Sequence, residues 1–134
     1  VALFAESFVK LGLIPGDGGA WFLPRAVGVS NANYMSFTGE SIKADKALQM
    51  GLVSEVLAPE KLMARAMEIA QLIAKNPPHA VRLAKQLIKG SEKSTLDETL
   101  DKSASFQAVC HAEPDHQEAI AAFFEKRDGN YRTR

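Results

Sequence analysis

The sequence has little cysteine, no excess of charge of either sign and no long apolar run. One cysteine, Cys110, among 134 residues excludes an internal disulfide and favours a reducing compartment, so we expect a cytoplasmic protein. The 16 basic and 16 acidic residues balance, which predicts no broad attraction to nucleic acid or to an anionic membrane. No apolar run approaches the roughly 20 residues that a membrane-spanning helix needs.

The start of the chain also lacks the features of a targeting segment. It begins at Val1 rather than at methionine, and it has neither a basic leader nor a long apolar core. We therefore expect a piece of a longer protein that begins inside a structural element.

A glycine-rich segment over residues 12–25 (GLIPGDGGAWFLPR) is the most distinctive stretch. Its glycines and proline free the backbone for positive φ, fix a turn and let other groups approach closely. Asp17 lies in the middle of the turn. It has two interpretations: it caps the following helix, as aspartate often does, or it moves a proton between carbon atoms of an acyl group.

Strand and turn patterns dominate the first part of the chain. We expect the end of a strand at residues 1–4 and a helix over 20–27 whose Trp21, Phe22 and Leu23 are mostly buried. A short helix over 30–37 should end at Gly39, because glycine suits a C-terminal cap. Further elements are predicted as a strand edge and helix over residues 42–50 and a short strand over residues 52–57.

The remainder of the chain is predicted to be helical. Apolar residues at three- and four-residue spacing indicate a helix over residues 62–73, and Pro78 begins another that Gly90 closes. Thr95 and Glu98 have the spacing of a capping box at the start of the next helix. Pro114 begins a last helix that closes near Gly129. The change in composition divides the chain into residues 1–58 and residues 59–134.

Cys110, His111 and His116 raise the possibility of a metal site. Cys110 and His111 are adjacent, and no fourth ligand stands at a familiar spacing. We interpret them as helix-surface residues and predict no metal.

Three motifs together resemble the crotonase family of enoyl-CoA hydratases and isomerases. They are the glycine-rich segment, the stretch TGESIKADKALQMGLVSEV over residues 38–56, and FFEKR over residues 123–127 with Tyr131 beyond it. The resemblance implies an α/β ClpP/crotonase-like spiral fold, seen here as its C-terminal portion, mostly helical with a few short strands. It also implies chemistry on an acyl-CoA thioester through an enolate. Coenzyme A would be part of the substrate, with no other cofactor.

The resemblance also implies site residues. Some family members carry an active carboxylate directly after the motif proline; here Gly16 takes that place and Asp17 follows. Two-glutamate hydratases carry one glutamate seven residues before that proline, which is the position of Phe8. Glu6 would lie two residues away on the same face if this segment is extended, and is otherwise a surface residue.

Other parts of the site follow from the same resemblance. Trp21 is expected to line the acyl pocket. Phe124 would lie near the adenine and Lys126 near the phosphates of a neighbouring subunit's coenzyme, with Phe123 in the core. The two backbone amides that polarise the thioester would come from the N-terminal half of the same subunit.

The resemblance assigns a role to each part of the chain. Residues 1–58 would form a wall of the acyl pocket, and residues 59–134 would build a homotrimer or hexamer. A non-catalytic crotonase-like assembly module is the alternative, because Phe8 cannot transfer a proton.

Overall fold

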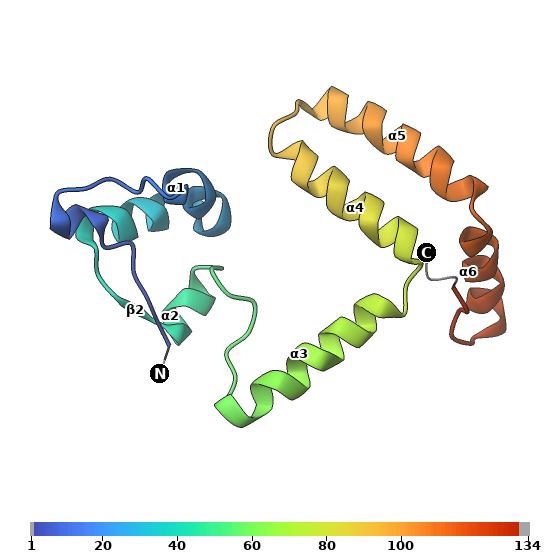
Figure 1. Cartoon of the computed structure of the whole chain (residues 1–134), viewed down its shortest axis with the longest axis horizontal. Helices are drawn as coiled ribbons and strands as arrows, with labels where there is room; N and C mark the ends of the chain where they lie inside the picture. The colour runs from blue at the N-terminus through green and yellow to red at the C-terminus, as the bar shows by residue number, and fades with distance from the viewer. Residues whose placement is uncertain (1, 132–134) are drawn as a thin grey trace. The chain divides into compact units, whose positions relative to one another are not determined.

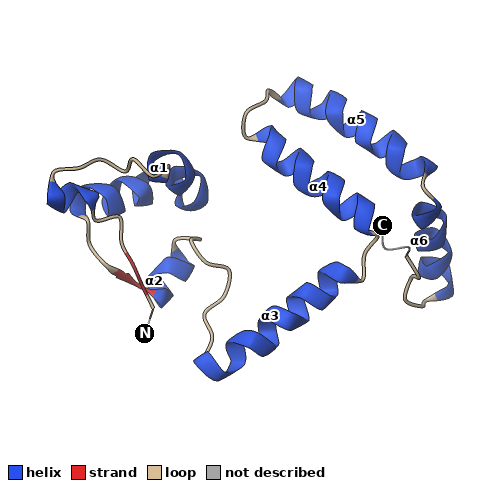
Figure 2. Ribbon diagram, viewed as in Figure 1, coloured by secondary structure: helices blue, strands red, loops and turns tan. Residues whose placement is uncertain are grey.

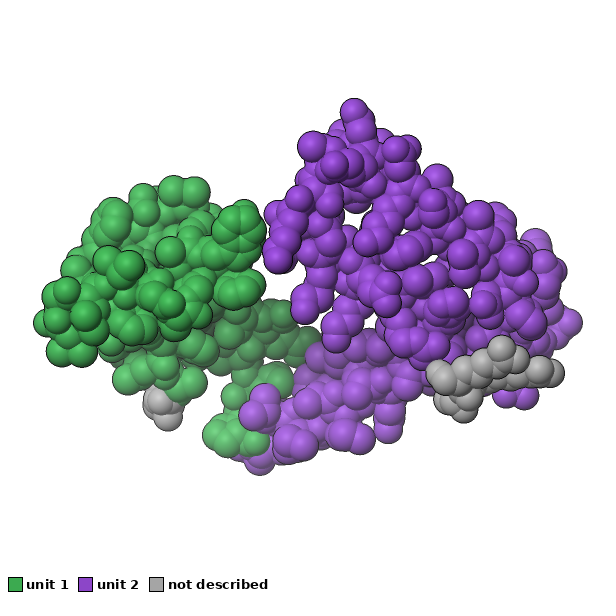
Figure 3. Space-filling view, turned by 45° about the horizontal axis from the view of Figure 1, so that its top comes forward, with its two compact units in different colours: residues 1–59 green, residues 60–134 purple. Residues whose placement is uncertain are grey.

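The computed structural model describes residues 2–131, and the chain divides into two compact units, residues 1–59 and residues 60–134 (Figure 3). The division falls beside the change in composition that follows Leu57. Each unit is described by itself.

Unit 1 contains a short ladder and three helical segments. Strand β1 (Leu3–Phe4) pairs antiparallel with β2 (Ile42–Lys43), with Leu3 opposite Lys43 (Figure 2). The 3-10 helix η1 (Phe8–Leu11) and helix α1 (Gly19–Thr38) lie between the strands in sequence, and α2 (Ala44–Gln49) follows β2.

Helix α1 is two helices joined at a kink. Gly28 has φ 77° and ψ 158°, values that no L side chain adopts easily, and it interrupts the helical backbone. The kink falls between the two helices that the sequence predicts over residues 20–27 and 30–37. At the end of α1, Gly39 has φ 58° and its N–H donates to the carbonyl of Met35, which confirms the predicted glycine cap.

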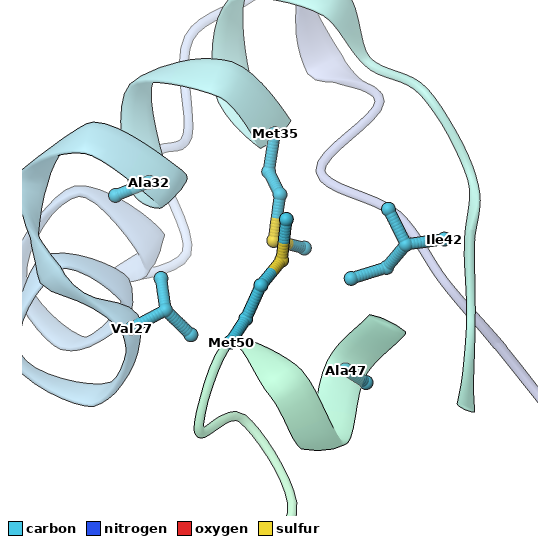
Figure 4. Packing of buried hydrophobic residues seen from close by; sticks show 6 residues of the cluster. All are labelled: Val27, Ala32, Met35, Ile42, Ala47 and Met50. Atoms are coloured by element: carbon cyan, nitrogen blue, oxygen red, sulfur yellow. The ribbon is translucent and has the colours of Figure 1, made fainter. Parts of the chain in front are cut away.

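A small apolar core holds unit 1 together. Figure 4 shows its buried side chains, which come from both halves of α1, from β2, from α2 and from the residue that follows α2: Val27, Ala32, Met35, Ile42, Ala47 and Met50. Leu23 packs against this core, but Trp21 and Phe22 are 42% and 63% exposed, so their predicted burial is wrong in this chain. Helix α1 turns other side chains toward the core.

The strand predicted over residues 52–57 is absent, because these residues form an irregular connection. Leu52 and Val53 nevertheless pack against the core of unit 1. Their apolar character therefore reflects packing rather than strand pairing. Among the described residues the two-stranded ladder of β1 and β2 is the sheet that forms.

Unit 2 is helical, as predicted. Helices α4 (Pro78–Ser91) and α5 (Leu96–Ala112) lie side by side and run in opposite directions, and α5 also contacts α6 (Pro114–Glu125) (Figure 1). The capping box is confirmed at the start of α5: Glu98 N–H donates to Thr95 Oγ1 at 3.3 Å, and Thr95 N–H donates to Glu98 Oε2 at 2.8 Å. Helix α3 (Pro59–Ala74) precedes these three in the chain.

Helix α6 ends earlier than the sequence predicts. Its last residue is Glu125, and Lys126 follows in the left-handed region at φ 55°. The Lys126 N–H donates to the carbonyls of Ala122 and Phe123, which closes the helix. Lys126 therefore takes the place that a glycine commonly occupies.

Much of the apolar surface of unit 2 is open. None of the described residues of α3, α4 or α5 is fully buried, and Met63 and Leu62 on α3 are 68% and 56% exposed. Such a wide apolar face is typical of a surface that another segment covers. Within residues 2–131, no helix combines the length and the apolar character that crossing a membrane requires.

Candidate active site

The glycine-rich turn connects η1 to α1. Gly12, at φ 69°, closes η1 by donating its N–H to the carbonyls of Phe8 and Val9. The chain then turns until Gly18, at φ 99°, forms the N-cap of α1. Because both positions have positive φ, the glycines place the first turn of α1 beside the segment that leads from β1.

Asp17 is bound to the beginning of α1. The Gly19 N–H donates to Asp17 Oδ1 at 2.9 Å, whereas the N-cap residue Gly18 has no side chain to cap the helix. The carboxylate therefore satisfies one of the free N–H groups of the helix start, from one residue before the N-cap. Its side chain stays exposed. Both interpretations of Asp17 remain compatible with this placement, since an anchored, accessible carboxylate can also accept a proton.

Glu6 lies against the same helix start. A methyl group at Gly19 would stand 2.5 Å from Glu6 Oε1 and 3.1 Å from Asp17 Oδ1, so both carboxylates border this one point. Glu6 Oε1 is buried, and it is the buried side-chain oxygen or nitrogen of the described residues that lacks a hydrogen-bond partner. Burial, and then the charge of Asp17, raise the pKa of Glu6 above its ordinary value.

The backbone that carries Glu6 to this site is not the extended segment that the sequence suggested. The segment is not extended through Phe8, because Ser7 has φ −92° and ψ 6° and η1 begins at Phe8. Glu6 thus reaches Gly19 from an irregular stretch between β1 and η1. The surface interpretation of Glu6 is wrong for its buried oxygen. In the sequence, the feature that could have indicated this position of Glu6 is Gly19, because a residue without a side chain leaves room for a second carboxylate.

An apolar hollow adjoins Gly19, the residue that both carboxylates border. It has a volume of about 380 Å³, and Gly19 forms part of its wall. Its other walls come from η1, the glycine-rich turn and α1, with Val9, Leu13, Ile14, Pro24, Ala32 and Phe37 among its apolar residues and Asn33 and Ser36 as polar ones. Pockets of this size and character suit the apolar part of a small ligand. A ligand in the hollow would therefore lie beside Gly19.

Trp21 is not among the residues that line this hollow. The Arg25 guanidinium stacks over its ring at 3.4 Å from the centroid, and Arg25 Nη1 donates to the Trp21 carbonyl. A role for Trp21 at an acyl group stays a prediction.

Phe124 and Lys126 belong to unit 2, whereas Glu6 and Asp17 belong to unit 1. Phe123 and Phe124 contact each other edge to face, and both are more than three-quarters exposed. The predicted burial of Phe123 is wrong in this chain, because α6 turns Ala122 inward instead. The predicted contacts of Phe124 and Lys126 with a coenzyme stay predictions.

A charged clamp holds the turn that carries Lys126. Both terminal nitrogens of Arg127 donate to Glu118, and Arg127 Nε donates to Glu125 at 2.6 Å. Asn130 N–H also donates to Glu118 at 2.8 Å. The hydrogen bonds from Arg127 and Asn130 lower the pKa of Glu118 from 4.5 to about 2. The clamp occupies Arg127, whereas the neighbouring Lys126 is exposed.

Acid should loosen this turn over a defined range. A lowered carboxyl pKa contributes stability that is present above 4.5 and is lost as pH falls toward about 2. We expect the protection factor of the Asn130 amide, the exchange rate of an unprotected amide at the same pH divided by that of Asn130, to fall across this range. In Glu118→Gln, which keeps an acceptor but has no charge to lose, the protection factor should be lower at neutral pH and nearly independent of pH. The same acid midpoint in both proteins would contradict the assignment to Glu118.

The candidate metal ligands form a different cluster in unit 2. The His111 and His116 rings stack at 4.7 Å, and His79 Nδ1 lies 3.1 Å from Glu113 Oε1. No group of three or more metal-binding side chains occurs among residues 2–131.

Comparisons with known proteins relate the whole chain to one family. The family model that matches residues 1–134 is described as enoyl-CoA hydratase/isomerase. The short-chain-enoyl-CoA hydratase of Clostridium acetobutylicum is 41% identical over 126 residues, which are 94% of this chain and 48% of that protein. The 1,2-epoxyphenylacetyl-CoA isomerase of Escherichia coli is 35% identical over 97% of this chain and 50% of its own length.

A solved structure gives the same relation in three dimensions. The crystal structure of enoyl-CoA hydratase from Bacillus anthracis is 38% identical and superposes with a TM-score of 0.89 over 93% of this chain and 48% of its own. The chain thus spans about half the length of these relatives.

Proposed function

Because the chain belongs to the enoyl-CoA hydratase/isomerase family, we propose that it forms part of an enzyme that hydrates an enoyl-CoA thioester or moves its double bond. The family and the predicted fold, the C-terminal portion of a crotonase-type subunit, are established by the family match and the solved neighbours. The reaction is the proposal. The observation that carries it is that Gly19 is bordered by two carboxylates and also forms part of the wall of an apolar hollow.

In this proposal Asp17 exchanges a proton with the carbon next to the thioester. A carboxylate anchored to Gly19, a residue in the wall of the apolar hollow, suits that role because it keeps its position while the acyl chain enters the hollow. The enolate that forms needs donors for its oxygen. We assign these to the N-terminal half of the same subunit, since the chain spans half of its relatives' length. Coenzyme A enters as part of the substrate, and no further cofactor is proposed.

The remaining proposed contacts involve both units. Trp21 would border the acyl group from the first turns of α1. Phe124 and Lys126 would contact the adenine and phosphates of a neighbouring subunit's substrate, a role that their exposure on the clamped turn allows. Residues 1–58 would then serve as a wall of the pocket, and residues 59–134 would assemble a trimer or hexamer through the exposed apolar faces.

The test is an assay of the full-length subunit that contains this chain. We expect it to consume crotonyl-CoA, followed by loss of the absorbance of the conjugated thioester, or to convert a 3-enoyl-CoA into the conjugated 2-enoyl-CoA. Chromatography of the products separates the two reactions. Binding of acyl-CoA without turnover of either substrate would contradict the proposal.

An assembly module is the second candidate function. The observation that favours it is the exposed apolar surface of α3, together with Phe8 at a position where two-glutamate hydratases carry a catalytic group. Intact mass and sedimentation of the isolated protein distinguish the two. A 134-residue polypeptide that forms trimers but turns over no thioester supports the module, whereas an active longer subunit supports the enzyme.

A further inference from the structure

We propose that Glu6 is a second catalytic carboxyl group of this site, and that Glu6 and Asp17 act as the acid and the base that add water to an enoyl thioester. The inference rests on the proposed function and narrows it to hydration. Both groups come from this chain and lie next to Gly19. They would replace the carboxylate that two-glutamate hydratases have at the position of Phe8.

The geometry places the two carboxyl groups at one point. Glu6 Oε1 and Asp17 Oδ1 lie within 3.1 Å of the position that a side chain on Gly19 would occupy. The two oxygens can approach this position because residue 19 is glycine, and the same residue forms part of the wall of the apolar hollow. An acyl chain in the hollow would lie beside Gly19, the residue that both carboxyl groups border.

The buried oxygen of Glu6 indicates a functional group rather than a structural one. Glu6 Oε1 has no hydrogen-bond partner, and a buried polar atom without a partner destabilises the folded state. A structural carboxylate would be expected to gain a donor or to face water. Here the oxygen instead lies against Gly19, a residue of the hollow's wall, so a small shift of the Glu6 side chain would let substrate or water supply the missing contact.

The two groups differ in their surroundings. Asp17 is exposed and accepts the Gly19 N–H at the start of α1. Burial and the nearby Asp17 charge favour the protonated form of Glu6. Paired carboxyl groups whose environments differ in this way supply one base and one acid.

Hydration then proceeds with balanced proton transfers. Asp17 takes a proton from water as the hydroxyl oxygen bonds to the β-carbon, and the electrons of the double bond move into the thioester to give its enolate. The enolate collapses as the α-carbon takes the proton of Glu6. Asp17 finally returns its proton to Glu6, which restores the pair and leaves a 3-hydroxyacyl thioester. Isomerisation needs one group that takes and returns a proton, so it depends on Asp17 alone.

The deciding variant is Glu6→Gln in the full-length subunit. Glutamine has nearly the same shape but has no acidic proton to give, so we expect crotonyl-CoA hydration to fall by about 10²–10⁴-fold. Isomerisation of a 3-enoyl-CoA should change less than tenfold. The matched control is Asp45→Asn, an exposed carboxylate in the first turn of α2, which should leave both rates unchanged.

The pH dependence provides a readout that a structural role would not change. In the parent protein, hydration should decline at high pH as Glu6 loses its proton, and the decline should disappear in Glu6→Gln. If this variant fails to fold, infrared spectra of the parent protein decide. A protonated carboxyl band should persist to a higher pH than that of ordinary carboxyl groups, and this upward shift should be smaller in Asp17→Asn.

The possible failures are distinguishable. Hydration that survives in Glu6→Gln, or a parent protein in which no protonated carboxyl band shows this upward shift, would overturn the role of Glu6 while leaving the proposed enzyme intact. A parent protein that turns over neither thioester would overturn the proposed function itself.

Discussion

Replacing Asp17 with asparagine will lower kcat for both hydration and isomerisation by about 10²–10⁴-fold, the usual contribution of a positioned acid or base. Asparagine keeps an oxygen that can accept the Gly19 N–H, so the start of α1 should persist. It cannot take a proton from water or from the carbon next to the thioester. The loss should therefore appear in kcat rather than in KM.

The measurement compares initial rates for crotonyl-CoA and for a 3-enoyl-CoA in the full-length subunit. Together with Glu6→Gln it gives a pattern: the Asp17 variant loses both reactions, whereas the Glu6 variant loses hydration. Asp45→Asn again serves as the control on a helix start. Unchanged turnover in Asp17→Asn would show that Asp17 serves only the N–H groups of α1.

Local signals predicted the helices well because those signals act within a few residues. The capping box of Thr95 and Glu98 and the glycine cap at Gly39 each form as their spacing indicates. Prolines 78 and 114 begin helices where their fixed φ and missing N–H are tolerated. The fold prediction rests on motif order along the whole chain, and the solved neighbours confirm it.

Burial could not be predicted in the same way, because it depends on which segments meet in space. Trp21, Phe22 and Phe123 are strongly apolar, yet all three are exposed in this chain. Residues 52–57 have the apolar character of a strand, but a strand requires a partner along its edge. The apolar pattern identifies residues that need cover without identifying what covers them.

The candidate site shows the same limit at the level of single side chains. The sequence places Asp17 in a glycine-rich turn, and the motif makes it a candidate without further information. Glu6 is separated from it by 3-10 helix η1 and the turn, and its position depends on the local conformation at Ser7. Only the folded turn brings Glu6 Oε1 against Gly19. The pair is therefore a property of the fold rather than of the motif.

The variant Gly19→Ala should change the positions of the carboxyl groups without much change in the stability of the fold. Residue 19 is the first residue of α1, where alanine is favoured over glycine by about 0.5–1 kcal/mol. Its methyl group would nevertheless stand 2.5 Å from Glu6 Oε1, a separation that neighbouring atoms do not tolerate. Because that oxygen ends a flexible side chain, Glu6 should move while the helix remains.

We therefore expect Gly19→Ala to keep its melting temperature within a few degrees while hydration falls by about 100-fold, the effect of displacing a reacting group by roughly 1 Å. Isomerisation should fall less, because Asp17 Oδ1 would be 3.1 Å from the new methyl group and needs to shift only slightly. Gly16→Ala is the matched control in the same turn, since its nearest atom, the carbonyl oxygen of Ile14, would lie 3.8 Å away. If hydration survives Gly19→Ala with the fold intact, the position of Glu6 does not matter to the reaction. If hydration is lost in Gly19→Ala but not in Gly16→Ala, residue 19 must be glycine because a side chain there would displace the carboxyl groups.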